Sequence, residues 1–296
     1  MSTIQKPDLY ARITNTIIAD LERGAPTWTK PWSANHLAGR ITRPLRHNLQ
    51  PYNGVNVLLL WAEATVRGFS APVWMTFRQA LALGAHVRKG ESGSTVLYAD
   101  HMVRTITSED GLGVDREIPF LKAYAVFNVE QIEGLPPQFN TPVAEPSEPE
   151  QRIKRADRFF ANLRADIRQG GSQAYYALNG DYVQLPPFES FINAERYYAT
   201  LGHECCHWTR HPARLDRGFG RKQWGDEGYA REELVAELGS AFLCADLELS
   251  PSPREDHAAY IQSWLEVLRS DKRFIFSAAA HAQRALDYLH NLQPPD

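Results

Sequence analysis

The feature that most constrains this chain is the stretch GHECCHWTRH at residues 202–211, which places His203, Glu204 and His207 in the order His-Glu-x-x-His. In a helix, positions i and i+4 lie about 40° apart around the axis, so both imidazoles project from one face. They can share a cation there, while the adjacent carboxylate reaches a metal-bound water without being a ligand. The stretch predicts His203 and His207 as metal ligands and Glu204 as the general base. The alternative is a surface helix that happens to carry two histidines.

A catalytic zinc also needs a third protein ligand and an open position. Downstream, the helical stretch EELVAELGSAFLC at residues 232–244 carries Glu233 and Glu237 four residues apart. In one arrangement Glu233 coordinates the metal and Glu237 accepts the remaining N–H of a ligating histidine. This order is similar to the third-ligand helix of thermolysin-like zincins. Glu237 as the ligand, or an ordinary solvated pair of glutamates, are the alternatives. The expected ion is Zn²⁺, with another divalent ion such as Mn²⁺ as the alternative.

The composition fits a globular protein of the cytoplasm. The chain has 296 residues with 43% hydrophobic content, enough for a core and for two domains. No apolar run approaches the ~20 residues that cross a bilayer, and the N-terminus lacks the layout of a secretory signal. Three cysteines do not make a disulfide framework. We therefore expect a cytoplasmic protein with no membrane partner.

A Pro-rich stretch without periodicity, residues 134–150, predicts a linker between a domain at 1–133 and a domain at 151–296. The apolar spacing in the front domain predicts helices at 7–24, 56–68 and 76–84 and strands at 94–100 and 121–134. In the back domain it predicts a hairpin at 174–191 and helices at 150–169, 193–211, 229–247, 253–270 and 274–292. The fold class is therefore α+β: a small α+β module joined to a zincin-like domain with a short antiparallel sheet and helices.

The front of the chain is basic although the net charge is −3. Residues 1–98 hold 11 Lys and Arg against 5 Asp and Glu. Cations alternate with aromatic residues in this part, as in proteins that bind single strands through backbone charges and stacked bases. The alternative is that Trp61, Trp74 and Phe77 are core residues, and this alternative is favoured for Trp61. The candidate DNA contacts are Trp28, Lys30, Trp32, Arg40, Arg43, Arg46, Trp74, Arg88 and Lys89.

Several strings together resemble the ArdC-type antirestriction proteins. PYNGVNVLLLW, WMTFRQALALGAHVRKGESGSTVLY and AYAVFNVEQ are similar to that family's N-terminal domain for single-stranded DNA. LGHECCHWTRHPARLDR and YAREELVAELGSAFLCADL are similar to its zincin-like metallopeptidase domain. The resemblance implies a protein that binds single-stranded DNA during plasmid transfer and shields it from host restriction. It also implies a metal site at His203 and His207 with Glu204 as the base.

Three functions compete on these residues. The first is a protector that coats single strands, with a metal domain that is structural. The second is a peptidase recruited by DNA, in which Glu204 drives hydrolysis of a protein such as a host restriction enzyme subunit. The third is a nuclease, which needs more acidic ligands than this pattern offers. A structural zinc does not need a carboxylate beside an open position, so Glu204 favours hydrolysis.

Overall fold

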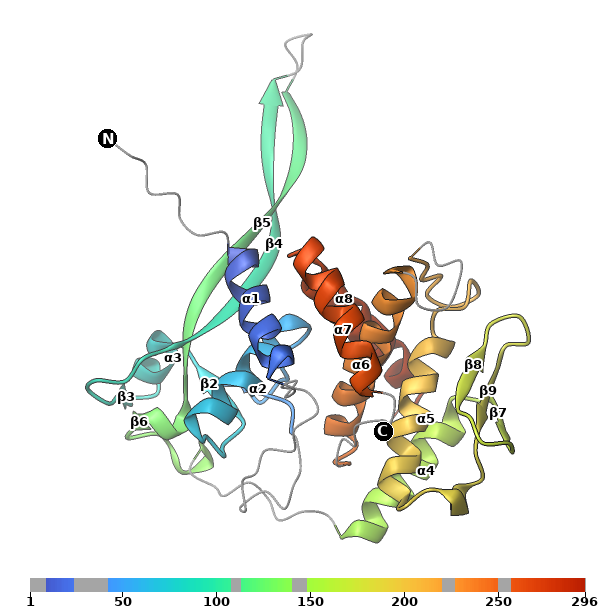
Figure 1. Ribbon diagram of the computed structural model, residues 1–296. Coiled ribbons are helices and arrows are strands. Elements are labelled where there is room, and N and C mark those ends of the chain that lie inside the picture. Colours follow the sequence, from blue (N-terminus) through green and yellow to red (C-terminus); the bar gives the residue numbers. More distant parts are fainter. Residues whose placement is uncertain are drawn as a thin grey trace.

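The computed structural model describes residues 9–23, 42–107, 113–139, 148–219, 227–249 and 257–295. Within these ranges the chain forms two halves, each of helices and sheet, which pack side by side (Figure 1). The α+β class predicted from the sequence is confirmed. No helix among the described residues is long and apolar enough to span a membrane.

The front half is built on a four-stranded sheet with the order β1-β2-β5-β4. Its strands are β1 (Leu45–Arg46), β2 (Val73–Met75), β4 (Ser94–Thr107) and β5 (Gly113–Asn128). A second, two-stranded sheet pairs β3 (His86–Val87) with β6 (Ile132–Glu133). The helices are α1 (Leu9–Glu22), α2 (Val55–Arg67) and α3 (Phe77–Ala82), with short turns η1 (Val129–Gln131) and η2 (Pro137–Phe139). Thr76 and Gln79 start α3 with a reciprocal capping box.

Strands β4 and β5 form a hairpin arm that rises above the rest of the molecule (Figure 1). The two strands pair in antiparallel register from Ser94 opposite Val126 to Thr107 opposite Gly113. The strands predicted at 94–100 and 121–134 cover only the base of this arm. Its outer part was missed because backbone pairing across a hairpin leaves no apolar pattern that marks where the strands end.

The back half has helices α4 (Pro149–Asn162), α5 (Ala194–Trp208), α6 (Glu227–Asp246), α7 (His257–Ser270) and α8 (Phe274–Asn291). Its sheet has the order β7-β9-β8, from β7 (Asp166–Gln169), β8 (Tyr175–Ala177) and β9 (Tyr182–Leu185), followed by the turn η3 (Phe188–Ser190). The predicted hairpin is present, because β8 and β9 pair in antiparallel fashion. The predicted helix at 150–169 was too long. Arg164 adopts a φ of 53°, which ends the helix, and β7 then pairs parallel to β9.

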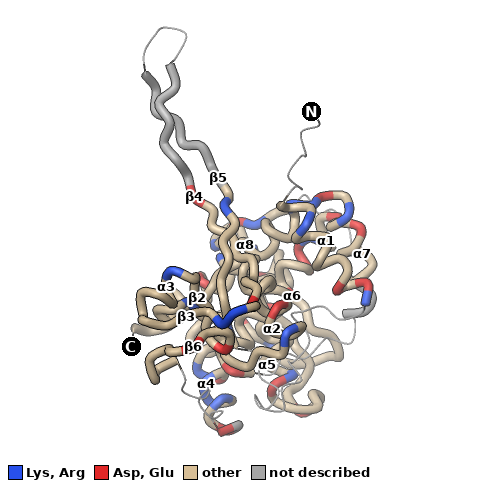
Figure 2. Tube along the Cα trace, turned by 90° about the vertical axis from the view of Figure 1, so that its left-hand side faces the viewer, with Lys and Arg blue, Asp and Glu red and all other residues tan. Residues whose placement is uncertain are grey.

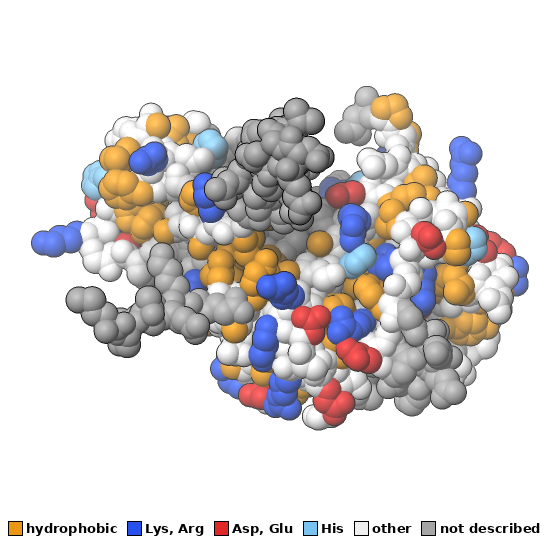
Figure 3. Space-filling model, turned by 90° about the horizontal axis from the view of Figure 1, so that it is seen from above, with side chains coloured by type: hydrophobic (Ala, Val, Ile, Leu, Met, Phe, Trp, Pro, Cys, Tyr) orange, Lys and Arg blue, Asp and Glu red, His pale blue; other side chains and the backbone are white. Residues whose placement is uncertain are grey.

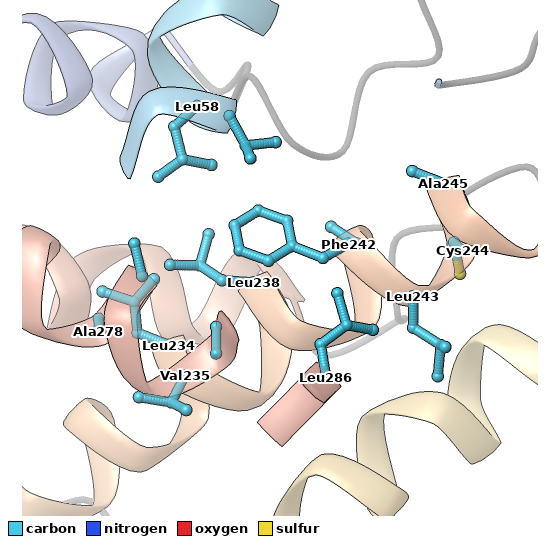
Figure 4. Packing of buried hydrophobic residues seen from close by; sticks show 14 of the residues in the cluster. Leu58, Leu234, Val235, Leu238, Phe242, Leu243, Cys244, Ala245, Ala278 and Leu286 are labelled. Atoms are coloured by element: carbon cyan, nitrogen blue, oxygen red, sulfur yellow. The ribbon is translucent and has the colours of Figure 1, made fainter. Parts of the chain in front are cut away.

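One hydrophobic core runs through both halves. Helix α2 of the front half packs against α8 and against α6, where the Trp61 and Phe242 rings meet edge to face at 5.8 Å. Figure 4 shows Leu58 facing Leu238 and Phe242 across this contact. Trp61 and Phe242 are both 0% exposed, and burial of such a side chain contributes roughly 1.5–3 kcal/mol. The division into domains at 1–133 and 151–296 stays a prediction, and the two halves do not separate without exposing these side chains.

Candidate metal centre

Helix α5 carries three of the predicted site residues on its last two turns. The side chain of Asn193 caps the helix by accepting a hydrogen bond from the backbone N–H of Arg196. His203, Glu204 and His207 are 2%, 2% and 8% exposed, so the alternative of a solvent-exposed helix face is wrong. Their burial places two imidazoles and a carboxylate where water competes little for a cation.

Helix α6 lies close to α5 because small residues line the contact. Ser240 on α6 donates a hydrogen bond to the carbonyl of Ala199 on α5 at 2.9 Å. A Cβ atom added to Gly239 would lie 2.6 Å from Sγ of Cys206. Burial raises the pKa of the Cys206 thiol to about 12, so the sulfur is a packing group in this contact. The close approach brings the glutamates of α6 to the histidines of α5.

Replacing Gly239 with Ala is expected to destabilise the protein by about 1–3 kcal/mol, because the added methyl group overpacks the contact with Cys206. Chemical denaturation of the variant measures the loss. The Gly239→Ala/Cys206→Ala double variant removes the sulfur and leaves the Cβ of residue 206 at 3.5 Å, so it should recover most of the stability. A double variant as unstable as Gly239→Ala would contradict the steric account.

Glu233 completes a set of three donors with the two histidines. One donor atom each from His203, His207 and Glu233 lie within 4.8 Å of one another. The carboxylate oxygens of Glu233 are 3.4 Å from Nε2 of His203 and 3.4 Å from Nε2 of His207, and the two Nε2 atoms are 3.1 Å apart. Two imidazoles and one carboxylate are a donor set that suits Zn²⁺ and also Mn²⁺, so the residues fit a divalent cation.

The outward nitrogens of both histidines face carboxylates. Oε2 of Glu237 lies 3.6 Å from Nδ1 of His203, and Oε1 of Glu232 lies 3.1 Å from Nδ1 of His207. The geometry thus favours Glu233 as the ligand and Glu237 as the partner of a ligating histidine, rather than the reverse. Glu232 was not predicted from the sequence. It adjoins Glu233 and has no spacing to α5 that a motif could reveal.

Arg217 was also missed, and it holds Glu232 in place. Its guanidinium donates to both Glu232 oxygens at 2.8 and 2.9 Å, to the carbonyl of Cys206 at 2.9 Å and to Oγ1 of Thr209 at 3.2 Å. The Arg217 side chain is 1% exposed and comes from the segment after α5. Arg217 therefore connects the C-terminal end of α5 to Glu232, the carboxylate that faces Nδ1 of His207.

The buried charges at the site shift the pKa values of His207, Glu232 and Glu233. Burial opposes the charge on His207, but Glu233 and Glu232 outweigh it and raise the His207 pKa to about 9. Burial also opposes the charge on Glu232, but Arg217 and His207 lower its pKa to about 2. The pKa of Glu233 is held well below its usual range against burial, chiefly by His207 and then His203. A cation held by this cluster would compete with a proton for His207, because a ligating imidazole must be neutral.

A cavity of about 280 Å³ opens beside these donors. Glu204, His207 and Glu233 line it together with Arg210, Tyr229 and Glu232. The opposite wall comes from the sheet, at residues 174–176 around the edge strand β8 and at Leu178. The predicted base and the donor set therefore face one common space.

The predicted DNA contacts separate into three groups. Arg46, Arg88 and Lys89 are exposed on the front half. Trp74 is 1% exposed, and Arg43 is 6% exposed with its guanidinium bonded to the carbonyl of Tyr52 and to Gln283 of the back half. Both are buried because the sheet and the contact between the halves enclose them, so neither can meet DNA in this structure. The remaining four, Trp28, Lys30, Trp32 and Arg40, lie outside the described residues.

Two exposed tyrosines on the arm were not predicted. Tyr98 on β4 and Tyr124 on β5 are 49% and 44% exposed and lie edge to face with ring centroids 6.3 Å apart. Lys122 is paired opposite Tyr98 in the ladder. Seen from above, hydrophobic side chains are exposed on the front half, with some Lys and Arg side chains beside them (Figure 3). Only the register of β4 against β5 brings Tyr98 and Tyr124 together, since 26 residues separate them in the sequence.

Comparisons with known proteins agree with both halves. The family described as the N-terminal domain of anti-restriction factor ArdC matches residues 7–127, and the family described as zincin-like metallopeptidase matches residues 154–281. The uncharacterized protein y4eC of Sinorhizobium fredii is 46% identical over an alignment of 298 residues that covers 98% of this chain and 94% of that protein. DNA primase TraC of Escherichia coli is 35% identical over 98% of this chain, which spans only 27% of the primase.

Solved structures give the same result over nearly the whole chain. The metal-free antirestriction ArdC protein from the R388 plasmid aligns with a TM-score of 0.81 and 45% identity, covering 96% of this chain and 97% of that one. Its Mn(II)-bound form aligns with a TM-score of 0.77 and 45% identity over 96% and 98%. From this coverage and from the two families matched in order, the chain belongs to the ArdC family of antirestriction proteins.

Proposed function

We propose that this chain binds single-stranded DNA without strong sequence preference and thereby protects incoming conjugative-plasmid DNA from host restriction. Its family supports the antirestriction role, and the solved relative is an antirestriction protein of a plasmid. The match to a family of N-terminal ArdC domains supports nucleic-acid binding by the front half. Cytoplasmic action follows from this role, because that is where transferred DNA meets restriction enzymes.

The observation that most supports DNA binding is the exposed pair Tyr98 and Tyr124 on the arm, with Lys122 beside them. Aromatic rings stack on bases of any sequence, and a neighbouring cation attracts the phosphates. Arg46, Arg88 and Lys89 add exposed positive charge on the same half. Lys and Arg are otherwise scattered among Asp and Glu along the trace (Figure 2), which favours contacts by stacking over a continuous basic track.

The Tyr98→Ala/Tyr124→Ala variant is expected to bind a single-stranded oligonucleotide at least roughly 30-fold more weakly, because each of two stacked bases contributes about 1–3 kcal/mol. Fluorescence anisotropy at fixed salt measures the loss, and protection of DNA transferred into restricting cells should fall with it.

Tyr175→Ala is the matched control for that experiment. Tyr175 is a similarly exposed tyrosine, 42% exposed, but it lies on β8 of the back half. The control should keep wild-type affinity for the oligonucleotide. Equal losses in both variants, or equal affinity of the wild type for duplex and single strands, would remove the arm from the binding surface.

We further propose that the back half is a metal-dependent peptidase, with a host restriction enzyme subunit as the class of substrate. The observation that most supports a peptidase is that Glu204 lines the same cavity as His207 and Glu233 of the donor set. His203, His207 and Glu233 would hold the ion, either Zn²⁺ or Mn²⁺. When bound, such an ion lowers the pKa of a coordinated water and polarises a scissile carbonyl.

The protein groups have separable tasks in this reaction. Glu204 accepts the proton of the attacking water and passes it to the leaving nitrogen. Glu232 and Glu237 hold the ring orientations of His207 and His203. Strand β8 is at the edge of its sheet, so an extended peptide can pair with it and lie along the cavity. A donor set with one carboxylate supports a peptidase over a nuclease.

Cleavage of a peptide mixture by the metal-loaded chain and by its Glu204→Gln variant tests the proposed peptidase function.

A further inference from the structure

The cavity is lined by one positively charged side chain, Arg210, that has no part in the proposed metal binding or proton transfer. Arg210 lies three residues after His207, is partly exposed, and lines the cavity together with Glu204 and Glu233. Within the part of the chain that the structure describes, its guanidinium forms no hydrogen bond and no ion pair. Its positive charge is therefore directed at the space where a substrate would lie.

Two further arginines in the described part of the segment after α5, residues 209–219, have acidic partners. Arg214 pairs with Asp181 and stacks on the Trp208 ring at 4.0 Å. Arg217 pairs with Glu232 on both oxygens. These two side chains stabilise the segment. Arg210 differs from them in its place at the cavity and in its lack of a carboxylate among the described residues.

The carboxylates in the cavity already have tasks. Glu233 belongs to the donor set, and Glu232 is paired with Arg217 and His207. Glu204 is the proposed base. An anionic group of a substrate would therefore find Arg210 available. A carboxylate accepts two parallel hydrogen bonds from a guanidinium, which makes this contact both strong and directional.

The size and the walls of the cavity favour an amino-acid side chain as the anion. About 280 Å³ is at the small end of ligand sites, so the space suits one side chain better than a nucleotide. Tyr175 and Leu178 are 42% and 40% exposed and give one wall an apolar surface. The adjacent edge of β8 offers backbone groups to an extended peptide.

We propose that Arg210 makes the site selective for peptides with an acidic side chain next to the scissile bond, an inference that rests on the proposed peptidase function. The carboxylate of the substrate binds the guanidinium while the peptide backbone lies along β8. A peptide with a neutral residue at that position leaves Arg210 without its partner. The enzyme therefore prefers the acidic peptide, because its transition state gains one charge-assisted hydrogen-bonded pair.

The first test is cleavage of a synthetic peptide mixture, balanced in all residue types, by the full chain loaded with Zn²⁺ or with Mn²⁺. Mass spectrometry should find Asp or Glu enriched at one position beside the cleaved bond. For matched peptides with Glu or Gln there, kcat/KM should differ by roughly 10- to 100-fold, from the strength of hydrogen bonds to charged groups. The Arg210→Gln variant should reduce that ratio to about one, and Arg210→Glu should prefer Lys at the same position.

The second test measures binding without cleavage. The metal-loaded Glu204→Gln protein should bind the Glu peptide more tightly than the Gln peptide, and adding Arg210→Gln should remove the difference. Arg158→Gln removes an exposed arginine of α4, outside this cavity, and serves as the control that keeps the preference. Peptides with a free or an amidated C-terminus show whether a terminal carboxylate, and not a side chain, is the group that binds.

The outcomes separate this inference from the peptidase function. Cleavage or binding that is indifferent to Glu and Gln overturns the role of Arg210 and leaves the peptidase intact. Absence of cleavage by the metal-loaded wild type overturns the peptidase, and the binding arm then decides whether Arg210 still selects acidic peptides. Weaker oligonucleotide binding by Arg210→Glu, with unchanged peptide preference, assigns the cation to phosphate and also overturns the inference.

Discussion

Glu204→Gln is expected to lower kcat/KM for peptide cleavage by about 10²- to 10⁴-fold, the usual contribution of a positioned general base. The amide keeps the size of the carboxylate, which matters at a site where residue 204 is 2% exposed, but it cannot accept a proton from water. Affinity for Zn²⁺ and Mn²⁺ should stay within about two-fold, because residue 204 is not one of the three converging donors. Competition with a chromogenic chelator measures the metal affinity.

The control for this result is Glu237→Gln, which also neutralises a glutamate beside a histidine but leaves the base in place. It should weaken metal binding and leave the cleavage rate of the fully loaded protein close to wild type. Full cleavage by Glu204→Gln would exclude Glu204 as the base. If that variant fails to cleave but still protects transferred DNA in restricting cells, coverage of the DNA is sufficient for protection and the peptidase serves another purpose.

Point variants, rather than a fragment of residues 1–133, should be used to separate DNA coverage from peptide cleavage. The front half packs Leu58 and Trp61 against Phe242 of the back half, and Arg43 bonds Gln283 across the same contact. A fragment would expose this apolar surface and remove the Gln283 acceptor of the Arg43 guanidinium. Loss of protection by such a fragment would report its misfolding and not the role of the metal domain.

The candidate metal ligands on α5 could be predicted from the sequence because the pattern that carries them is local. His203 and His207 are one turn apart, so helix periodicity alone brings their rings together. Glu233 was predicted for a related reason, since four residues later its helix also carries Glu237, the acid that faces His203. The motif did not include the contact between α5 and α6, which depends on Gly239 lying against Cys206.

The other parts of the site depend on tertiary packing, which composition does not encode. Arg217 has no periodic relation to Glu232 and reaches it only because the segment after α5 folds back. Trp74 and Arg43 matched the basic, aromatic composition of a nucleic-acid surface, yet both are enclosed. Conversely, Tyr98 and Tyr124 are exposed together through strand register. Sequence pattern thus found residue types suited to the chemistry, while packing decided which of them face solvent.

Arg217→Met is expected to reduce metal affinity by roughly 10- to 100-fold and stability by about 3–5 kcal/mol. The stability loss arises because Glu232, 1% exposed, would keep its charge with only His207 as a partner. The affinity loss arises because the carboxylate at Nδ1 of His207 is no longer held by two guanidinium bonds. Denaturation of the metal-free protein and chelator competition on the folded protein measure the two effects separately.

Arg214→Met provides the matched control. Arg214 comes from the same segment and its guanidinium is also enclosed, but it pairs with Asp181 and packs on Trp208 without touching Glu232. Its loss should cost stability while metal affinity stays near wild type. The double variant Arg217→Met/Glu232→Gln removes both buried charges and keeps an acceptor for Nδ1 of His207, so it should regain much of the stability.

Orientation of His207 and support of the fold can then be distinguished. If Arg217→Met lowered stability but bound Zn²⁺ and Mn²⁺ as tightly as wild type, Arg217 would serve folding alone. If metal affinity falls in Arg217→Met, stays unchanged in Arg214→Met and is partly restored in the double variant, the pair acts on the imidazole. The reason is that, among the described residues, Glu232 bonds both the Arg217 guanidinium and His207, a predicted metal ligand.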